Sequence, residues 1–569
     1  MGVFDYKSMT GDHGKALLND ALALSEYAYD STGQPLATGG WVPIGAQALG
    51  VTQHVDKQGT FWGETALASS ANVQVLGQYN SAGKLVAMGI AFRGTSFGLT
   101  LDGLGDVASD LAAAVLPGYA TDYAKLAFNA LLDNVASYAR DQGLTGKDIL
   151  VTGHSLGALG ANSLATLSHD HWGGFYQDAN YVTFASPTQS SGDTQVLNIG
   201  YENDPVFKAI DGKGINTSAL LWGNDRAWDS AANNLTSFTD NYASASAHLP
   251  NSLNLGVAKA HSLDGYAQGL GRIAASDFYD LTNKDSTIVV SSLSDAMRGT
   301  TWVQDLNRYA EKHTGNTFII GTEGNDLLKG GAGNDFLDGG AGNDRFRDDG
   351  GYNIVLGGQG DNVFELQKPL ATFSFANDGD GTLYINDAYG GISMTRDIGG
   401  LVSKETAYIP WTSIPWGSHA ITYQVSGNGL LAGTDLTQYA TSAKGDAGDN
   451  VLTAHAAGDW LFGLGGDDHL IGGQGNDVFV GGTGNDMMVS GGGNNTFLFN
   501  GLFGNDRIEG YQASDKFVFM GIPGLGQDYD YRSHATTVED NTVLSFGDNS
   551  VMLVGVGMTQ LNGAGIFIS

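Results

Sequence analysis

Residues 148–165 read DILVTGHSLGALGANSLA, and this stretch decides the fold of the N-terminal half. Its start has the apolar composition of a buried strand, and the small residues at its end are typical of a helix. Between them, Gly153-His-Ser155-Leu-Gly157 matches G-x-S-x-G, the nucleophile elbow. A strand, a glycine turn and a helix in this order expose the serine hydroxyl above the sheet. A glycine-rich turn with an incidental serine is the alternative interpretation.

The sequence on both sides of this stretch alternates between helical and strand-like patterns. Apolar residues recur with helical spacing in 16–24 and 119–138, and strand-like runs occupy 85–92 and 148–152. This alternation predicts an α/β layer fold. We expect this first domain to cover residues 1–320.

A nucleophilic serine needs a histidine base and an orienting acid, which in α/β-hydrolases follow it in the order acid, then histidine. The apolar run 196–201 reads as a strand and ends close to Asp204, which Pro205 follows. We therefore expect Asp204 to be the acid. Three aspartates in polar loops are weaker candidates: Asp193, Asp225 and Asp229. The residues alone leave His248 and His261 as close alternatives for the base.

The C-terminal half has a different sequence pattern, with nonapeptide repeats in two blocks. The first block covers 321–365 and the second 445–498, with the pattern G-G-x-G-x-D-x-U-x, in which U is apolar. This pattern is known from calcium-binding parallel β-helices. The stretch between the blocks, 366–444, is rich in aromatic and β-branched residues and predicts additional strands. A flexible linker rich in Gly, Asn and Asp is the alternative interpretation.

The sixth position of each repeat supplies a hard oxygen ligand, which calcium prefers. We expect the aspartates at this position to bind Ca²⁺, namely Asp326, Asp335, Asp344, Asp459, Asp468, Asp477 and Asp486. Four repeats carry asparagine there instead: Asn353, Asn362, Asn450 and Asn495. The sequence thus predicts a second, all-β domain over 321–569 that contains two parallel β-rolls and folds with calcium.

Composition excludes several classes of protein. The 569 residues carry a formal charge of −33, which argues against nucleic acid or an anionic membrane surface as a partner. Cysteine is absent, so disulfides and thiolate metal sites are impossible. No apolar run is long enough for a transmembrane helix. The first residues do not resemble a signal peptide. The motif H-E-x-x-H, which a zinc protease would need, does not occur.

Several segments together resemble the RTX lipases of Gram-negative bacteria. They are Ala91-Phe-Arg-Gly-Thr95, Gly153–Gly157, Ala185-Ser-Pro-Thr, Gly200–Pro205 and Thr301-Trp-Val-Gln-Asp-Leu-Asn, followed by the repeats. The resemblance implies an α/β-hydrolase domain before the β-rolls. Within it, Lys259-Ala-His261 matches the position of the catalytic histidine, and His248 lies too early. It also implies export through a type I ABC exporter, with the C-terminal segment as an uncleaved signal, and an extracellular enzyme. We expect a monomer.

The same resemblance implies the reaction, a two-step acyl transfer to Ser155. His261 takes the serine proton and Asp204 stabilises the imidazolium. We expect the oxyanion to be held by the backbone N–H of Leu156 and by a second donor from Thr95. A non-enzymatic RTX adhesin or pore-former, by contrast, would lack an ordered Ser, Asp and His.

A lid and structural calcium ions are implied as well. Apolar residues recur with helical spacing from Leu101 to Val115, where related lipases have a mobile lid, and Asp106 and Asp110 match its calcium ligands. An ordinary amphipathic helix packed on the sheet is the alternative interpretation. A further calcium site near the triad acid is implied at positions matching Glu202, Asp225 and Asn234.

One departure from the family pattern concerns the substrate. The lipases have a long apolar insertion after the first helix, whereas here Tyr29 passes almost directly to Trp41. One lid is therefore expected to be missing, which leaves the site more open. We expect a lipase that acts on triacylglycerol at a lipid–water interface. Phospholipase A1 or a generalist carboxylesterase is the alternative.

Overall fold

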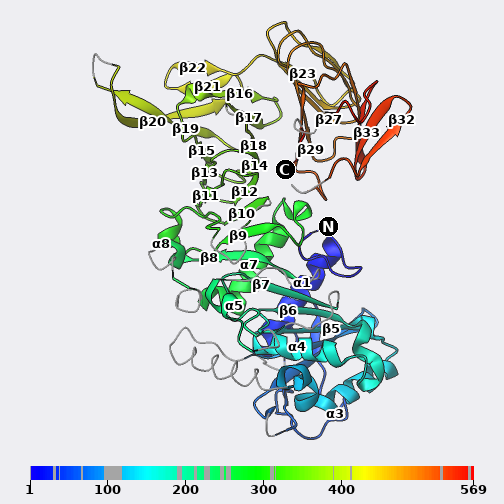
Figure 1. Ribbon diagram of the computed structural model, residues 1–569. Helices are drawn as coiled ribbons and strands as arrows, with labels where there is room; N and C mark the ends of the chain where they lie inside the picture. The colour runs from blue at the N-terminus through cyan, green and yellow to red at the C-terminus, as the bar shows by residue number, and fades with distance from the viewer. Residues whose placement is uncertain are drawn as a thin grey trace.

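The computed structural model describes most of the chain. The described residues are 2–29, 34–36, 39–65, 68–94, 118–188, 195–210, 214–222, 231–243, 249–250, 258–307, 313, 316–388, 390–409, 413–525, 530–561 and 566–568. Figure 1 shows a helix-containing part that holds the N-terminal half, and a part built of strands that holds the C-terminal half. Within these residues, no helix has both the length and the apolar character needed to cross a membrane.

A single sheet organises the N-terminal half. Its strands are hydrogen-bonded in the order β1 (Trp41–Pro43), β3 (Asn72–Tyr79), β4 (Leu85–Phe92), β5 (Ile149–His154), β6 (Asn180–Phe184), β7 (Val196–Tyr201), β8 (Ala232–Phe238) and β9 (Thr287–Ser291). The short β2 (Phe61–Trp62) pairs with β3. From β4 to β9 every pairing is parallel. The carboxyl ends of these strands therefore meet at one edge of the sheet.

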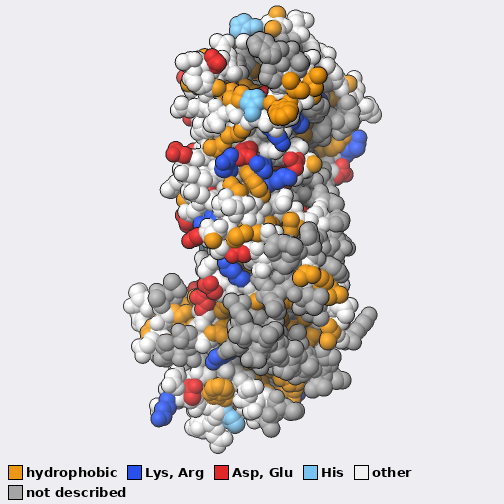
Figure 2. Space-filling view, turned by 90° about the vertical axis from the view of Figure 1, so that its left-hand side faces the viewer, with side chains coloured by type: hydrophobic (Ala, Val, Ile, Leu, Met, Phe, Trp, Pro, Cys, Tyr) orange, Lys and Arg blue, Asp and Glu red, His pale blue; other side chains and the backbone are white. Residues whose placement is uncertain are grey.

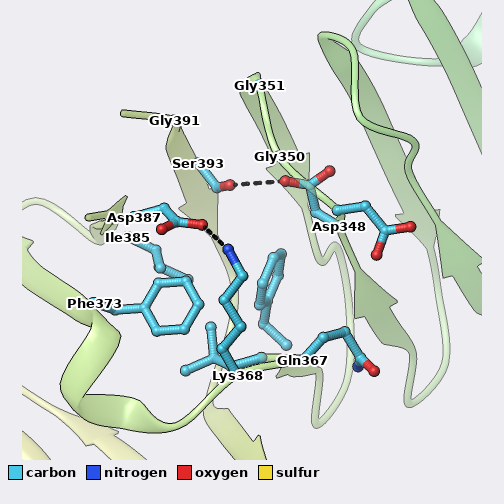
Figure 3. Close-up of a pocket in the computed structure, with 13 residues that line it drawn as sticks. Asp348, Gly350, Gly351, Gln367, Lys368, Phe373, Ile385, Asp387, Gly391 and Ser393 are labelled. Carbon is cyan, nitrogen blue, oxygen red and sulfur yellow. Dashed lines mark hydrogen bonds and ion pairs between the residues drawn. The ribbon is translucent and has the colours of Figure 1, made fainter. Parts of the chain in front are cut away.

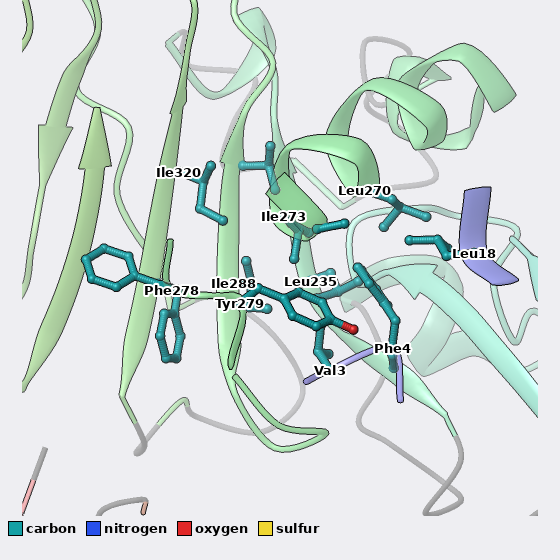
Figure 4. Close-up of a cluster of buried hydrophobic side chains, with 14 of the residues drawn as sticks. Val3, Phe4, Leu18, Leu235, Leu270, Ile273, Phe278, Tyr279, Ile288 and Ile320 are labelled. Atoms are coloured by element: carbon teal, nitrogen blue, oxygen red, sulfur yellow. The ribbon is translucent and has the colours of Figure 1, made fainter. Parts of the chain in front are cut away.

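Helices cover both faces of this sheet, as the alternating sequence pattern predicted. Helices α1 (Asp12–Tyr29) and α7 (Leu263–Ala275) bury Leu18 and Leu270 on one face. Figure 4 shows the first of these hydrophobic clusters, into which Phe4 from the N-terminal segment also packs. Helices α3 (Tyr119–Asp141) and α4 (Leu156–Leu167) bury Phe128 and Leu159 on the other face. Short helices complete this half: α5 (Thr217–Trp222), α6 (Ala258–His261) and α8 (Asp295–Arg298).

The sheet does not end with the helices but continues into the repeats. Strand β10 (Thr317–Thr322) pairs in parallel with β9 on one side and with β12 (Asp335–Gly340) on the other. The sheet then continues through β14 (Tyr352–Leu356). The hydrogen-bonded sheet is therefore continuous on both sides of residue 320, where the sequence predicts a domain boundary. The division into 1–320 and 321–569 stays a prediction.

The repeats form short parallel strands that alternate between two sheets. In the first block one sheet holds β10, β12 and β14, and the other holds β11 (Leu327–Lys329), β13 (Arg345–Arg347) and β15 (Val363–Glu365). Paired residues are two repeats apart, as in Leu327 with Arg345. The eighth, apolar position points inward: Leu328, Phe346 and Phe364 are all buried.

The second block repeats this arrangement. One of its sheets holds β23 (Ser442–Lys444), β25 (Trp460–Gly465), β27 (Val478–Thr483), β29 (Thr496–Asn500), β31 (Lys516–Met520) and β35 (Ile566–Ile568). The other holds β24 (Val451–Thr453), β26 (His469–Ile471), β28 (Met487–Val489), β30 (Asn505–Glu509), β34 (Asn549–Leu553), β33 (Asn541–Phe546) and β32 (Ala535–Val538). The strands of the repeats pair in parallel.

The segment between the blocks consists of strands, as predicted. Strands β16 (Phe373–Asn377), β17 (Thr382–Asp387) and β18 (Ile392–Arg396) extend the long sheet beyond β14. Strands β19 (Gly400–Tyr408), β20 (Pro415–Ser426), β21 (Gly429–Ala432) and β22 (Asp435–Gln438) extend the other sheet beyond β15. The hairpin of β19 and β20 projects from the body of the molecule at the upper left of Figure 1.

Aromatic contacts hold the parts of the molecule together. Phe318 on β10 stacks on Phe336 on β12 with ring centroids 4.6 Å apart, and Phe278 meets Phe336 at 5.3 Å. Tyr384 from the inserted strands meets Trp460 of the second block at 5.2 Å. The inserted strands therefore pack against the second repeat block, and the first block packs against the N-terminal half.

Replacing Phe318 tests this continuous core. The ring is buried where the sheet passes from β9 into the repeats. Phe318→Ala therefore leaves a cavity between the N-terminal half and the first repeat block. We expect a loss of about 3–5 kcal/mol in the free energy of unfolding, measured by urea denaturation with calcium present. Leu502→Ala, at a side chain that is 67% exposed, is the control and should change it by less than about 0.5 kcal/mol. Equal effects of the two substitutions would contradict the packing described.

Candidate active site

The backbone turn at Ser155 holds its side chain at the carboxyl edge of the sheet. Strand β5 ends at His154 and α4 begins at Leu156, and Ser155 between them has φ 57° and ψ −126°. A Cβ added to Gly157 would lie 2.1 Å from the carbonyl oxygen of Phe92. A Cβ added to Gly153 would lie 2.4 Å from the backbone of Gly157. Both glycines of the motif are therefore required by close backbone contacts, and the positive φ of Ser155 is the strained conformation of a nucleophile elbow.

The structure brings Ser155, His261 and Asp204 together in a buried row. Nδ1 of His261 lies 3.0 Å from each carboxylate oxygen of Asp204. Nε2 of the same ring lies 3.1 Å from the hydroxyl oxygen of Ser155. With the Nδ1 proton donated to Asp204, Nε2 is left to accept the serine proton. The three residues come from segments more than 40 residues apart, at the ends of β5 and β7 and in α6.

Two further donors fix the carboxylate of Asp204. The backbone N–H of Val206 donates to Oδ1 at 2.8 Å, and the Tyr266 hydroxyl donates to Oδ2 at 2.9 Å. The Tyr266 hydroxyl in turn accepts from the backbone N–H of Tyr201 at 2.9 Å. Burial raises the pKa of Tyr266 well above its usual range, so the hydroxyl stays a donor. Sequence reasoning missed Tyr266, because no local pattern connects it with Asp204.

His154, the variable residue of the motif, supports the backbone of His261. Its Nε2 lies 2.7 Å from the carbonyl oxygen of His261, and its Nδ1 lies 2.9 Å from the Tyr29 hydroxyl. Burial lowers the pKa of His154 well below its ordinary value, so the ring is neutral. A neutral ring can donate from Nε2 to the carbonyl while Nδ1 accepts from Tyr29. Neither His154 nor Tyr29 was identified from the sequence.

Of the two predicted oxyanion donors, one lies within the described residues and the other outside them. Leu156 is the first residue of α4 and directly follows Ser155. Thr95 lies outside the described residues. Its neighbour Gly94 is described, and a Cβ added there would lie 3.2 Å from the Cβ of Ser155. The turn after β4 therefore approaches the nucleophile, and the roles of Leu156 and Thr95 stay predictions.

Several other expectations fall outside the described residues. These are the lid helix with Asp106 and Asp110, the calcium ligand Asp225, and the alternative base His248. Glu202 and Asn234, the remaining candidates for the calcium site near the triad acid, are described. The amide of Asn234 donates to the carbonyl of Asp285 at 3.3 Å. Glu202 is buried two residues before Asp204.

His313 connects the loop of the triad acid with the start of the repeats. Its Nε2 donates to Oε1 of Glu202 at 3.1 Å, and its Nδ1 donates to Oδ2 of Asp305 at 2.7 Å. Burial alone would lower the pKa of His313, but the two carboxylates raise it to about 10. His313 is therefore a cation at neutral pH. Sequence reasoning missed its role, because Glu202 lies 111 residues away along the chain.

In the repeats, the sixth-position side chains form a regular ladder. The backbone N–H of Asp326 donates to Oδ1 of Asp344 at 2.7 Å, and that of Asp468 donates to Oδ1 of Asp486 at 2.8 Å. The same bond joins Asp335 with Asn353 and Asp459 with Asp477, both at 2.8 Å. One side-chain oxygen of each acceptor is thus engaged by the backbone two repeats earlier in the chain.

The second oxygen of several of these carboxylates is buried and has no hydrogen-bond partner within the described structure. This holds for Asp344, Asp459, Asp468 and Asp486, and also for Asp506, which follows the repeats. Burial raises the pKa of Asp335 and Asp344 to about 7 and that of Asp486 to about 6. Buried carboxylates that each have one oxygen without a hydrogen-bond partner fit a hard cation. Such a cation would supply the positive charge that balances these carboxylates.

Two ligand candidates were missed because the repeat period is interrupted. The backbone N–H groups of Asp486 and Asn495 donate, both at 2.9 Å, to Asp506 and Asp515, which lie 20 residues further on. Two residues, 499–500, are inserted before Gly501-Leu-Phe-Gly-Asn-Asp506, which otherwise follows the repeat pattern. Burial raises the pKa of Asp506 to about 8. A search that allowed this insertion would have found both residues.

Side chains alone do not form a metal cluster. Over the described ranges, no three His, Asp or Glu side chains gather closely enough to bind a metal. Calcium also accepts backbone carbonyl oxygens, so a turn with one carboxylate suffices in repeats of this kind. The pocket in Figure 3 lies between the first repeat block and the inserted strands. Lys368 pairs with Asp387 there at 2.7 Å, and none of the three triad residues lines it.

Comparisons with known proteins agree with this architecture. The RTX calcium-binding nonapeptide repeat matches residues 313–346, 338–366, 439–470 and 462–497. A lipase from Pseudomonas fluorescens is 46% identical, over 57% of this chain and 79% of that protein. A second lipase from the same species is 43% identical, over 57% of this chain and 84% of that protein. The crystal structure of the extracellular lipase LipA from Serratia marcescens covers all of both chains, with 43% identity and a TM-score of 0.91.

The chain therefore belongs to the RTX lipase family, and the expected resemblance is confirmed. It is an enzyme, a hydrolase of the lipase class. Its repeats bind calcium, as the sequence predicted. The roles of the individual catalytic and metal-binding residues stay predictions.

Tyr266→Phe tests the support of Asp204. The substitution removes one donor to the carboxylate and leaves the backbone N–H of Tyr201 without its acceptor. A hydrogen bond to a charged group contributes about 1.5–3 kcal/mol, so we expect kcat to fall about tenfold or more with KM little changed. Tyr176→Phe is the control, because it removes a buried hydroxyl that donates to the carbonyl of Leu132, outside this site. A Tyr266→Phe enzyme with unchanged kcat would contradict the role assigned here.

Removal of calcium should unfold the repeat blocks, because their buried carboxylates then lack a counter-charge. We expect a chelator to reduce the β-sheet signal in circular dichroism, and added calcium to restore it. Asp344→Asn should raise the calcium concentration needed for recovery about tenfold, whereas Asp361→Asn, at an exposed side chain, should not. A spectrum that is unchanged in excess chelator would contradict calcium-dependent folding.

Proposed function

We propose that the chain is a secreted, calcium-dependent serine hydrolase that cleaves lipid carboxyl esters, with triacylglycerol as its substrate. The observation that carries the proposal is the buried row Ser155–His261–Asp204, with contacts of 3.1 and 3.0 Å. In this proposal the N-terminal half is an α/β-hydrolase domain, and the repeats form two β-rolls. The parallel strands β4 to β9 and the two-repeat pairing of the strands support these assignments.

The reaction begins when His261 accepts the hydroxyl proton of Ser155 at Nε2. The serine oxygen then attacks the ester carbonyl carbon, and the carbonyl oxygen becomes an oxyanion. Asp204 stabilises the imidazolium that forms. Collapse of the tetrahedral intermediate breaks the bond to the alcohol, which takes the proton from His261. Water then attacks the acyl-serine, again with His261 as the base, and releases the fatty acid.

The oxyanion is held by two backbone N–H groups. Leu156 provides one, because it is the first residue after the nucleophile, and Thr95 provides the second. The close approach of Gly94 to Ser155 supports a donor from that turn. The helix N-terminus adds a favourable electrostatic contribution, since its partial positive charge faces the developing anion.

Calcium stabilises the fold in which these residues meet. The ions supply positive charge beside the repeat carboxylates, held by the sixth-position residues Asp326, Asp335, Asp344, Asp459, Asp468, Asp477 and Asp486. Asp506 joins this set because of its vacant buried oxygen. We also retain Glu202, Asp225 and Asn234 near the triad acid, and Asp106 and Asp110 in the lid, as ligand positions. The repeats further support export in the unfolded state through a type I ABC exporter, before calcium is met outside the cell.

Phospholipase A1 is the second candidate, and one observation favours it. Helix α1 ends at Tyr29 and β1 begins at Trp41, which leaves no room for a long lid insertion between them. A less covered site accommodates bulkier and more polar head groups. The same triad chemistry would then release the sn-1 acyl chain of a phospholipid.

Parallel assays on emulsified triolein and on mixed phosphatidylcholine micelles, both with calcium, test the proposal. We expect faster release of fatty acid from triolein. In Ser155→Ala, hydrolysis of both substrates should fall at least about 10⁴-fold. Ser137→Ala, at an exposed position on α3, is the control and should remain fully active.

Two results would change the proposal. Faster cleavage of phosphatidylcholine at sn-1 would make phospholipase A1 the function. Full activity of Ser155→Ala would contradict the mechanism altogether.

A further inference from the structure

The tip of the β19–β20 hairpin exposes a cluster of large apolar side chains. Trp416 is 79% exposed, Ile414 57%, Tyr408 55% and Ile409 39%. We call these four residues the hairpin tip. Twelve large hydrophobic side chains are exposed in the described part of the chain, and four of them lie here within nine positions. Contiguous exposed apolar surface of this kind marks an interaction site.

The base of the hairpin is built into the protein, whereas its outer half stands clear. Leu401 on β19 and Tyr423 on β20 are buried in the core of the first repeat block. From Pro415 to Ala420, by contrast, every residue of β20 is exposed. Since successive side chains of a strand point to opposite faces, both faces of the outer hairpin are open to solvent. The tip therefore projects into solvent from a hairpin whose base is packed in the protein core.

The chemistry of the tip differs from that of the rest of the molecule. The chain carries a charge of −33, yet no Asp, Glu, Lys or Arg occurs between Thr406 and Ser418. In Figure 2 hydrophobic side chains gather in the upper part of the face shown, where the hairpin points toward the viewer. Basic side chains lie below them, whereas acidic side chains lie below them and at the upper left edge. Trp and Tyr are the residues that prefer the boundary between lipid and water.

The hairpin extends to the same side of the molecule as two helices of the N-terminal half. Ser155 lies at the carboxyl edge of the sheet, and α8 follows the carboxyl end of β9 at the same edge. In Figure 1 both α8 and α5 lie on the left-hand side of the molecule, and the hairpin extends to the left as well.

We propose that the hairpin tip is an anchor that inserts into the surface of the lipid phase that holds the ester substrate. The inference rests on the proposed function, because that function places the enzyme at a lipid–water interface. An uncharged, aromatic tip fits neutral or zwitterionic lipid. It would let the acidic body stay in water while the enzyme remains attached to the lipid phase.

Vesicles that the enzyme cannot hydrolyse separate binding from catalysis. The double substitution Ile414→Ser and Trp416→Ser removes the two most exposed tip side chains, and Val451→Ser with Leu502→Ser is the matched control, at 70% and 67% exposed positions elsewhere. We measure cosedimentation of the full chain with vesicles of diether phosphatidylcholine in calcium. Hydrolysis of emulsified triolein and of the soluble ester p-nitrophenyl acetate is measured in parallel, and circular dichroism verifies the fold.

We expect the tip variant to bind vesicles and to hydrolyse triolein about tenfold less well or worse, because burial of two large apolar side chains is lost. Its rate on the soluble ester, and both properties of the control variant, should match the wild type. Vesicle binding that is unchanged in the tip variant would overturn the inference. So would a dimer in light scattering that the tip variant abolishes without a change in vesicle binding. Wild-type protein that binds vesicles through the tip but hydrolyses no lipid ester would support the anchor and contradict the proposed function.

Discussion

The backbone turn at Ser155 is the constraint on which the candidate active site depends. A positive φ of 57° is unfavourable for serine. Gly153 before it and Gly157 after it make the turn possible, because they allow backbone segments to approach closely. The turn is maintained because β5 and α4 are both anchored in the core. Its consequence is that the serine hydroxyl meets His261 at the edge of the sheet. A relaxed turn would move the hydroxyl away from the imidazole.

Buried hydrogen bonds extend this constraint outward from the serine. The carbonyl of His261 is held by His154, and the carboxylate of Asp204 by Tyr266. His313 then joins the loop that holds Asp204 to Asp305, just before the first strand of the repeats. Because the central sheet continues from β9 through β10 into the repeats, the two halves of the chain share one sheet. The two halves are thus joined by strand pairing and by buried hydrogen bonds, and not only by the continuous chain.

Local patterns in the sequence predicted the elements, and the contacts between distant segments had to come from the structure. The strand, turn and helix around Ser155 were predictable because glycine spacing and apolar periodicity act over a few residues. Strand β7 was predicted at its observed bounds for the same reason. Tyr266 was missed because Asp204 lies 62 residues away, and the link from His313 to Glu202 was missed because it spans 111 residues; no periodicity reports such contacts. Asp506 was missed because a two-residue insertion breaks the repeat period.

The most direct test of the account asks which serine reacts as the nucleophile. The full-length enzyme in calcium is treated with a serine-directed phosphonate ester, and the modified peptide is identified by mass spectrometry as a function of time. The account predicts one adduct, on the peptide that contains Ser155, and a labelling rate that falls at least about 10³-fold in His261→Ala. An adduct on a different serine, or labelling of Ser155 at the same rate without His261, would contradict it.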